Sequence, residues 1–111
     1  MSKFDEKLEK YTAAYKEKVG GELDQELLRK VTKGLGPSIY NRDAETISAE
    51  TSEMERVVKN YLEKKLGLSG DGLMGSVEAV MEKYGKSERA KYRAVLYYML
   101  CVHHGKQDIY N

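Results

Sequence analysis

The chain has 111 residues, of which 33% are charged and 41% are hydrophobic, and its formal net charge is +1. This length suits one domain with a single core, and the small net charge argues against a partner held by overall electrostatic attraction. The single cysteine excludes an intramolecular disulfide, so we expect a reducing, cytoplasmic environment. The N-terminus, MSKFDEKLEK, lacks the apolar run of a signal peptide, and the longest apolar run has nine residues, Ala94 to Val102. A bilayer needs roughly 20, so we expect no membrane partner.

Two amphipathic helices are predicted in the first third of the chain. Apolar side chains recur every three or four positions between Phe4 and Val19, and Ser2 is suited to cap that helix. Asp24 is suited to cap a second, shorter helix that reaches about Lys33. Glycines follow both segments, which is typical of helix ends because glycine takes the left-handed conformation without strain.

The segment from Gly34 to Ala49 has no clear period and contains the only proline of the chain, Pro37. It also contains Ile39, Tyr40 and Ile47, which are too apolar for a loop that makes no contact with a core. We therefore expect an ordered loop with room for a turn of helix, and we expect Ile39 and Tyr40 to pack into the bundle. Long ordered loops are more often functional than short ones.

Two further helices are predicted after this loop. Ser52 and Glu55 have the spacing of a capping box for a third helix that extends to about Leu66. A fourth helix is indicated by apolar residues at helical spacing from Leu73 to Tyr84.

The last helix is expected over residues 87–104, with Ser87 as its N-cap and Gly105 after its end. Its second half is apolar on every side, which is typical of a helix surrounded by others. No strand pattern is evident. The sequence therefore predicts an all-α fold, a compact bundle of about five helices packed around this C-terminal helix, in a single domain over 1–111.

Tyrosine is unusually frequent, with nine Tyr against one Phe and no Trp. These side chains suit the rim of a small core, where the ring is buried and the hydroxyl reaches water or a carbonyl. The alternative is a contact surface, since tyrosine is enriched at interfaces.

Three stretches in this order, LLRKVTKGLGPSIYNRDAETIS, LEKKLGL and KYRAVLYYML, carry a resemblance over nearly the whole chain. Together they resemble a small bacterial family known only as domain of unknown function 2853. The resemblance implies a bacterial, cytoplasmic protein. It implies no activity, cofactor or catalytic residue, because none is assigned to that family.

The sequence offers little for catalysis or metal binding. Cys101, His103 and His104 are close together, but zinc needs three or four ligands in fixed geometry and no second His or Cys cluster exists. We expect Cys101 to be an inert core residue and His103 to lie at the core edge. The carboxylates lie mostly on helix faces beside lysines. We therefore expect no metal, no cofactor and no enzymatic activity.

Five basic residues fall within an eleven-residue stretch where the fourth and last predicted helices meet: Lys83, Lys86, Arg89, Lys91 and Arg93. A helix, a tight turn and a basic helix start are similar to a helix-turn-helix. This basic corner is a candidate nucleic-acid contact, or a contact for an acidic protein surface. The alternative is a solvated helix start with no binding role.

The run VTKGLGPS is similar to a helix-hairpin-helix, whose turn offers backbone N–H groups to phosphates, although Val31 stands one position too early. The candidate functional loop comprises Gly34, Gly36, Pro37, Ser38 and Tyr40. A purely structural loop is the favoured alternative. The leading hypothesis for the whole chain is a protein-binding or regulatory module with an unknown protein partner. Nucleic-acid binding through the basic corner or this loop is the alternative.

Overall fold

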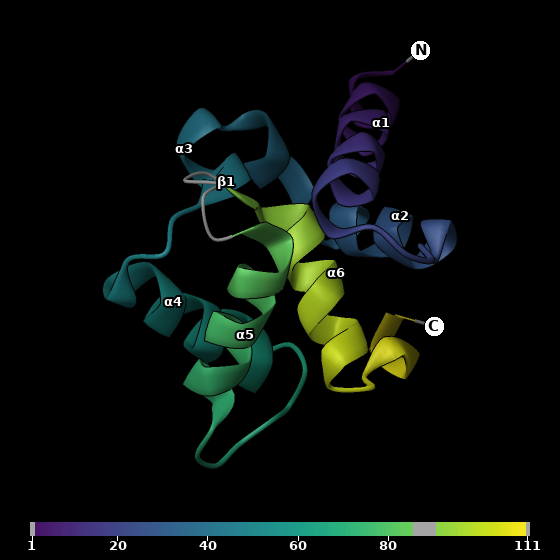
Figure 1. The fold of residues 1–111 in the computed structure, drawn as a ribbon. Helices are drawn as coiled ribbons and strands as arrows, with labels where there is room; N and C mark the ends of the chain where they lie inside the picture. The colour runs from purple at the N-terminus through teal and green to yellow at the C-terminus, as the bar shows by residue number, and fades with distance from the viewer. Residues whose placement is uncertain (1, 86–90, 111) are drawn as a thin grey trace.

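Six α-helices and four shorter helical segments make up most of residues 2–85 and 91–110, which are the residues that the computed structural model describes (Figure 1). The α-helices are α1 (Lys3–Ala14), α2 (Gln25–Gly34), α3 (Arg42–Glu45), α4 (Thr51–Val57), α5 (Leu73–Gly85) and α6 (Arg93–His103). Two π-helical segments continue α1 and α4, namely η1 (Tyr15–Val19) and η3 (Val58–Glu63), and two 3-10 helices are η2 (Gly36–Tyr40) and η4 (Gln107–Tyr110). The predicted all-α bundle is confirmed.

Helix α6 occupies the centre of the bundle, between α5 on one side and α1 and α2 on the other (Figure 1). Every side chain from Ala94 to Cys101 is buried, and Leu96 and Leu100 are completely inaccessible. Burying one such leucine stabilises the fold by about 1.5–3 kcal/mol. The nine-residue apolar run therefore forms the core that the other helices cover, as predicted.

The start of the last helix differs from the prediction. Helix α6 begins at Arg93, and Lys91–Tyr92 instead form a short strand, β2, which pairs antiparallel with β1 (Thr46–Ile47). The expected N-cap, Ser87, lies outside the described residues. The expectation of no strand is also wrong, because pairing with a segment some forty-five residues earlier overrides the local preference for helix.

Helix caps near the N-terminus follow the prediction. The hydroxyl of Ser2 accepts a hydrogen bond from the Asp5 N–H at 3.1 Å, and the Asp24 carboxylate accepts one from the Leu27 N–H at 3.1 Å. The predicted cap at Ser52 is wrong, because α4 begins at Thr51 and makes no side-chain cap bond.

The segment 34–49 is ordered and forms η2, α3 and β1 in turn. Ile39 and Ile47 are buried, but Tyr40 is 49% exposed, so its predicted packing into the bundle is wrong. Neighbouring side chains of a 3-10 helix point about 120° apart, because the helix has three residues per turn. When Ile39 faces the core, Tyr40 therefore cannot do so.

Candidate protein-binding groove

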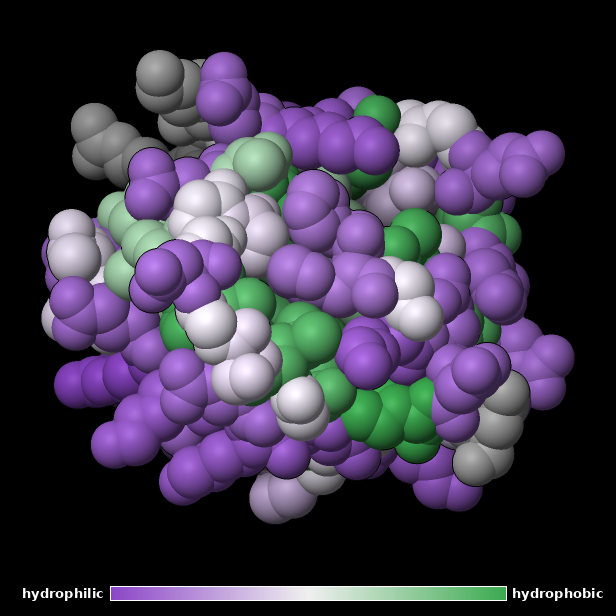
Figure 2. Space-filling model, turned by 90° about the horizontal axis from the view of Figure 1, so that it is seen from below, coloured by the Kyte–Doolittle hydropathy of each residue, from purple (hydrophilic) through white to green (hydrophobic). Residues whose placement is uncertain are grey.

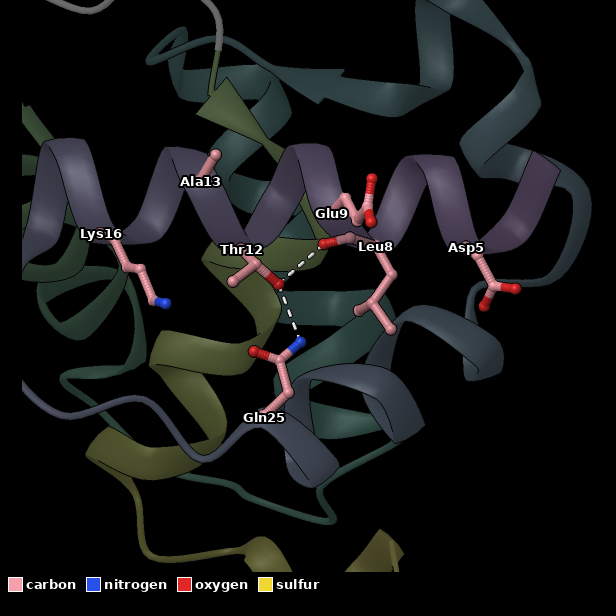
Figure 3. Close-up of a pocket in the computed structure, with 7 residues that line it drawn as sticks. All are labelled: Asp5, Leu8, Glu9, Thr12, Ala13, Lys16 and Gln25. Atoms are coloured by element: carbon pink, nitrogen blue, oxygen red, sulfur yellow. Dashed lines mark hydrogen bonds between the residues drawn. The ribbon is translucent and has the colours of Figure 1, made fainter. Parts of the chain in front are cut away.

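A groove of about 580 Å³ runs along the outer side of α1 where α2 begins (Figure 3). On the inner side of the same helix, Tyr11 and Tyr15 are buried in the core. The groove is lined by Asp5, Leu8, Glu9, Thr12, Ala13 and Lys16 of α1 and η1, and by Gln25 of α2. Each lining residue of α1 and η1 has another three or four positions away, so the groove follows one broad face of the helix.

Gln25 of α2 forms the wall of the groove, and hydrogen bonds fix it to α1, which forms the floor. The Thr12 hydroxyl donates to the Leu8 carbonyl at 2.8 Å and accepts from Nε2 of Gln25 at 2.8 Å (Figure 3). Leu8, half-buried, points to the same side of α1 as Thr12 and contributes apolar surface. The groove is thus formed in the chain itself and does not require a partner to shape it.

Two tyrosines hold the connection that brings Gln25 to this position. The Tyr15 hydroxyl donates to the Glu22 carbonyl at 3.1 Å, and the Tyr98 hydroxyl accepts from the Asp24 N–H at 2.9 Å. These bonds join the turn between α1 and α2 to buried rings of η1 and α6. The position of the groove wall therefore depends on the core.

The groove has opposite charges at its two ends. Asp5 lies toward the N-terminal end of α1 and Glu9 near the middle of the groove, whereas Lys16 lies at the other end (Figure 3). Glu9 and Lys16 are exposed, and Asp5 is partly exposed. Between Asp5 and Lys16 the helix rises by roughly 16 Å at about 1.5 Å per residue. A partner can therefore distinguish one end of the groove from the other.

Other hollows are smaller than the α1 groove, and one of about 400 Å³ lies beside it, lined by residues that include Ala13, Glu17 and Tyr92. The space-filling view from below shows a band of apolar side chains from its centre to the lower right, bordered by hydrophilic ones (Figure 2). Val102 is 43% exposed and belongs to a hollow of about 100 Å³ that it shares with Val19, Val80 and Met99. This volume is much smaller than that of the α1 groove.

The structure describes three residues of the predicted basic corner, Lys83, Lys91 and Arg93, and these three do not form one exposed surface. Lys83 is exposed on α5, but Lys91 is only 2% exposed, with its Nζ 6.0 Å from the centre of the Tyr84 ring. Arg93 is also turned inward: its Nε donates to the Ala44 carbonyl at 2.7 Å. Lys91 is therefore buried rather than exposed, because the pairing of β2 with β1 draws it against the bundle, and Arg93 is half-buried. Lys86 and Arg89 lie outside the described residues.

The residues of the predicted functional loop lie close together, where α2 ends and η2 begins. Gly36 has a φ of 61° and is exposed, Pro37 is exposed beside it, and the Ser38 hydroxyl donates to the Leu35 carbonyl at 2.8 Å. Gly34 ends α2 close to the Tyr110 ring, and Tyr40 is exposed. The positive φ explains the need for glycine at position 36, as the structural interpretation of the loop requires.

A buried polar cluster at Glu45 was not predicted. Its Oε2 accepts from the Tyr11 hydroxyl at 2.7 Å and from Lys7 Nζ at 2.9 Å, and Lys10 Nζ lies 3.6 Å away. Burial alone raises the pKa of Glu45, but the bonds from Tyr11 and Lys7 and the charges of both lysines outweigh it and lower the pKa. Burial, together with Glu45, raises the pKa of Tyr11. Nothing in the local sequence indicates this cluster, since the lysines lie on a face that resembles a solvated one.

Ser76 and His104 lie close enough to suggest a nucleophile and its base, but their hydrogen bonds run the wrong way. Nε2 of His104 is 2.9 Å from the Ser76 Oγ, which itself donates to the Leu73 carbonyl at 2.7 Å. Because the serine hydrogen is used there, His104 must donate, whereas a general base must accept. The pair therefore links α5 to α6. Burial, assisted by His103 and Lys106, lowers the pKa of His104.

The remaining candidates for metal binding or nucleophilic chemistry are separate. Cys101 is fully buried and its pKa is raised by burial, as expected for a core residue. His103 is exposed, so its predicted place at the core edge is wrong: it is the last residue of α6, where the helix leaves the bundle. Within 2–85 and 91–110, no three His, Cys, Asp or Glu side chains are grouped to hold a metal ion.

Comparison with known proteins agrees with the resemblance seen in the sequence. A family model described as "Protein of unknown function (DUF2853)" matches residues 10–108. The chain belongs to this family. No curated protein matches the sequence. The DUF2853 match covers the fold from the middle of α1 to η4, so Asp5, Leu8 and Glu9 of the groove precede it. Among the described parts of this DUF2853 chain, no helix has the length and apolar character needed to cross a membrane.

Proposed function

We propose that the chain is a protein-binding module whose groove along α1 holds an amphipathic helix of a partner protein. The observation that carries this proposal is the combination of an apolar floor with opposite charges at the two ends of one helix face. Helix-in-groove recognition uses such surfaces, with the guest helix anchored at every third or fourth residue.

The dimensions of the groove match a short guest helix. The rise of roughly 16 Å from Asp5 to Lys16 corresponds to about three helical turns. Leu8 and Ala13 can accept small or aliphatic guest side chains. A basic residue at one end of the guest would face Asp5, and an acidic residue at the other end would face Lys16. This charge order fixes the direction in which the guest lies.

The test is a titration with a synthetic helical peptide of about 14 residues, which has an aliphatic stripe, lysine at one end and glutamate at the other. Amide chemical shifts of the 15N-labelled chain report where it binds. We expect changes concentrated at Leu8, Thr12 and Gln25. Ala13→Glu should abolish them, because Ala13 is exposed in the groove and makes no core contact that this change would remove.

The matched control is Val102→Glu, which places the same acidic side chain on the exposed end of α6. This variant should bind like the parent chain. Shift changes confined to another face, or equal binding by the Ala13 variant, would refute the groove as the binding site. A peptide with scrambled apolar spacing and the same composition tests whether the stripe, rather than charge alone, is recognised.

A second candidate function is nucleic-acid binding through the loop, and the exposure of Tyr40 favours it. The ring is 49% exposed, and Lys33 and Arg42 on the neighbouring helices are exposed as well. An exposed aromatic residue with basic residues near it in the sequence suits stacking on an unpaired base. Fluorescence anisotropy with a labelled single-stranded oligonucleotide tests this: binding should weaken with salt and with Tyr40→Ala, whereas Ala13→Glu should leave it unchanged. Binding that is insensitive to Tyr40→Ala would exclude the loop.

A further inference from the structure

We propose that the hollow beside the groove binds a small, planar aromatic molecule that carries an anionic group. This site goes beyond the proposed function, because it takes a small molecule rather than a helix, and it shares only Ala13 with the groove. Its volume of about 400 Å³ falls in the range of roughly 300–1,000 Å³ that is usual for small-molecule pockets.

One wall of this hollow is a stripe of α1 and η1 that has small side chains at its middle. The stripe has helical spacing and consists of Lys10, Ala13, Ala14, Glu17 and Lys18. The two alanines leave open the space that longer side chains at these positions would fill. The charged residues therefore stand at the two ends of the stripe, with an apolar surface between them.

The remaining wall exists because β1 pairs with β2. Thr46 and Tyr92 are register partners in this two-stranded sheet, so their side chains lie on the same face of it, and both line the hollow together with Tyr84. The Tyr92 N–H donates to the Tyr84 hydroxyl at 3.2 Å, and the centre of the Tyr92 ring lies 5.1 Å from that of Tyr11. This wall therefore provides aromatic surface that is held in place, which suits a flat ring.

Lys10 supplies the positive charge for an anion. Its Nζ lies 5.0 Å from the centre of the Tyr92 ring and 3.6 Å from Oε2 of Glu45, and it makes no hydrogen bond to the residues that the structure describes. The N–H donors of this ammonium group are therefore available to a ligand. Because Glu45 already accepts from Lys7 and Tyr11, the two lysines and the one carboxylate leave a net charge of +1 at this end of the hollow.

Two hydroxyl groups can add to the contacts of the anion. Neither the Thr46 hydroxyl nor the Tyr92 hydroxyl makes a hydrogen bond to a described residue, and both residues line the hollow. A charge-assisted bond from an ammonium group, joined by hydroxyl donors, suits a phosphate or a carboxylate. At the other end of the stripe Glu17 and Lys18 lie 4.0 Å apart, so their charges offset one another. The anionic group therefore binds at the Lys10 end, and the ring lies along the alanines.

Adenosine monophosphate and 2-naphthoate are the probes, because each joins a flat ring to an anionic group, a phosphate in the first and a carboxylate in the second. Amide chemical shifts of the 15N-labelled chain follow each titration, and we expect changes concentrated at Ala13, Thr46 and Tyr92. A probe that binds should do so at least about tenfold more tightly than its uncharged or ringless counterpart, because both parts of the molecule contribute. These counterparts are adenosine and inorganic phosphate for the first probe, and 2-naphthamide and acetate for the second.

Lys10→Gln tests the contact with the anion and should weaken binding of the probe about tenfold. The fold should survive this change, because Glu45 keeps its bonds from Lys7 and Tyr11, and circular dichroism checks this. The matched control is Lys16→Gln, which removes the same charge from an exposed lysine of η1 that does not line the hollow. This variant should bind the probe like the parent chain.

The two probes distinguish the sources of the anion. Binding of adenosine monophosphate alone assigns a phosphate ligand, binding of 2-naphthoate alone assigns a carboxylate, and either result supports the site. Shift changes away from the hollow, equal binding by a counterpart, or binding that ignores Lys10→Gln would overturn the inference. A chain that binds neither probe up to about 10 mM would overturn it as well.

Discussion

The hydrogen bond between Tyr11 and Glu45 should contribute measurably to stability, because both groups are removed from water. Tyr11 is completely inaccessible and Glu45 is 9% exposed, and the bond is 2.7 Å long. Hydrogen bonds to charged groups contribute about 1.5–3 kcal/mol. Lys7 remains bonded to the carboxylate when the tyrosine hydroxyl is removed, so we place Tyr11→Phe near the lower end of that range.

A double-mutant cycle isolates this contribution. The free energy of unfolding in urea is measured for the parent, Tyr11→Phe, Glu45→Gln and the double variant, and we expect a coupling energy of about 1–2 kcal/mol. The exposed pair Glu26–Lys30, 3.7 Å apart on α2, is the matched control and should couple by no more than about 0.5 kcal/mol. Coupling between Tyr11 and Glu45 below about 0.5 kcal/mol would refute the reasoning, since independent sites add within that limit.

The same cycle has a pH dependence of known sign. The pKa of Glu45 is lowered in the folded chain from its usual value of 4.5. The unfolded chain therefore takes up the proton first as pH falls. The stabilisation is fully present above pH 4.5 and is lost as pH falls through the folded pKa. Coupling that stays constant to pH values well below this would show that the carboxylate charge is not involved.

Three further predictions concern other parts of the fold. The pKa of His104 is lowered in the folded chain, so the unfolded chain binds the proton more readily and stability should decrease as pH falls below the usual histidine value of 6.5. In urea melts at pH 5–7, His104→Gln should reduce this pH dependence. The control His103→Gln changes an exposed histidine and should not reduce it. Gly36→Ala should cost about 1–2 kcal/mol, because φ is 61° although a Cβ there meets nothing within 4 Å. Gly75→Ala, inside α5 and equally unobstructed, should instead stabilise by up to about 1 kcal/mol, and a loss there equal to that at position 36 would contradict the conformational argument. Leu96→Ala should cost about 2–5 kcal/mol in thermal or urea unfolding, and a cost under about 1 kcal/mol would show that the centre of α6 is not close-packed.

The parts of the fold that were predicted correctly depend on local signals. Ser2 and Asp24 cap the residues that immediately follow them, and the apolar run of α6 is buried because it has no polar side. Lys91 and Arg93 were misplaced because their surroundings come from β1 and α3, which lie far away in the sequence. No periodicity within residues 87–104 contains that information.

The groove could be predicted only in part. The spacing of Leu8, Thr12 and Lys16 places them on one face of the first helix, but the same pattern describes an ordinary solvated face. What makes it a groove is the position of Gln25, which follows a turn that contains Gly20 and Gly21. The direction in which α2 leaves that turn is set by contacts with η1 and α6 rather than by the turn residues themselves.

Tyrosine hydroxyls fix the positions of several connecting segments relative to the core, including the turn from which α2 leaves. The ring of Tyr98 is buried in α6 while its hydroxyl accepts from the backbone at Asp24, and the Tyr84 hydroxyl accepts from the Tyr92 N–H at 3.2 Å. Tyr61 meets the hydroxyl of Tyr110, at 2.8 Å, and so joins η4 to the core. In each case a ring fills the core and its oxygen joins a segment outside the long helices. Phenylalanine would fill nearly the same volume but would remove the hydrogen bond that holds each of these segments to the core. The bond between the Tyr98 hydroxyl and the backbone at Asp24 is one of them, and it positions the groove wall at Gln25.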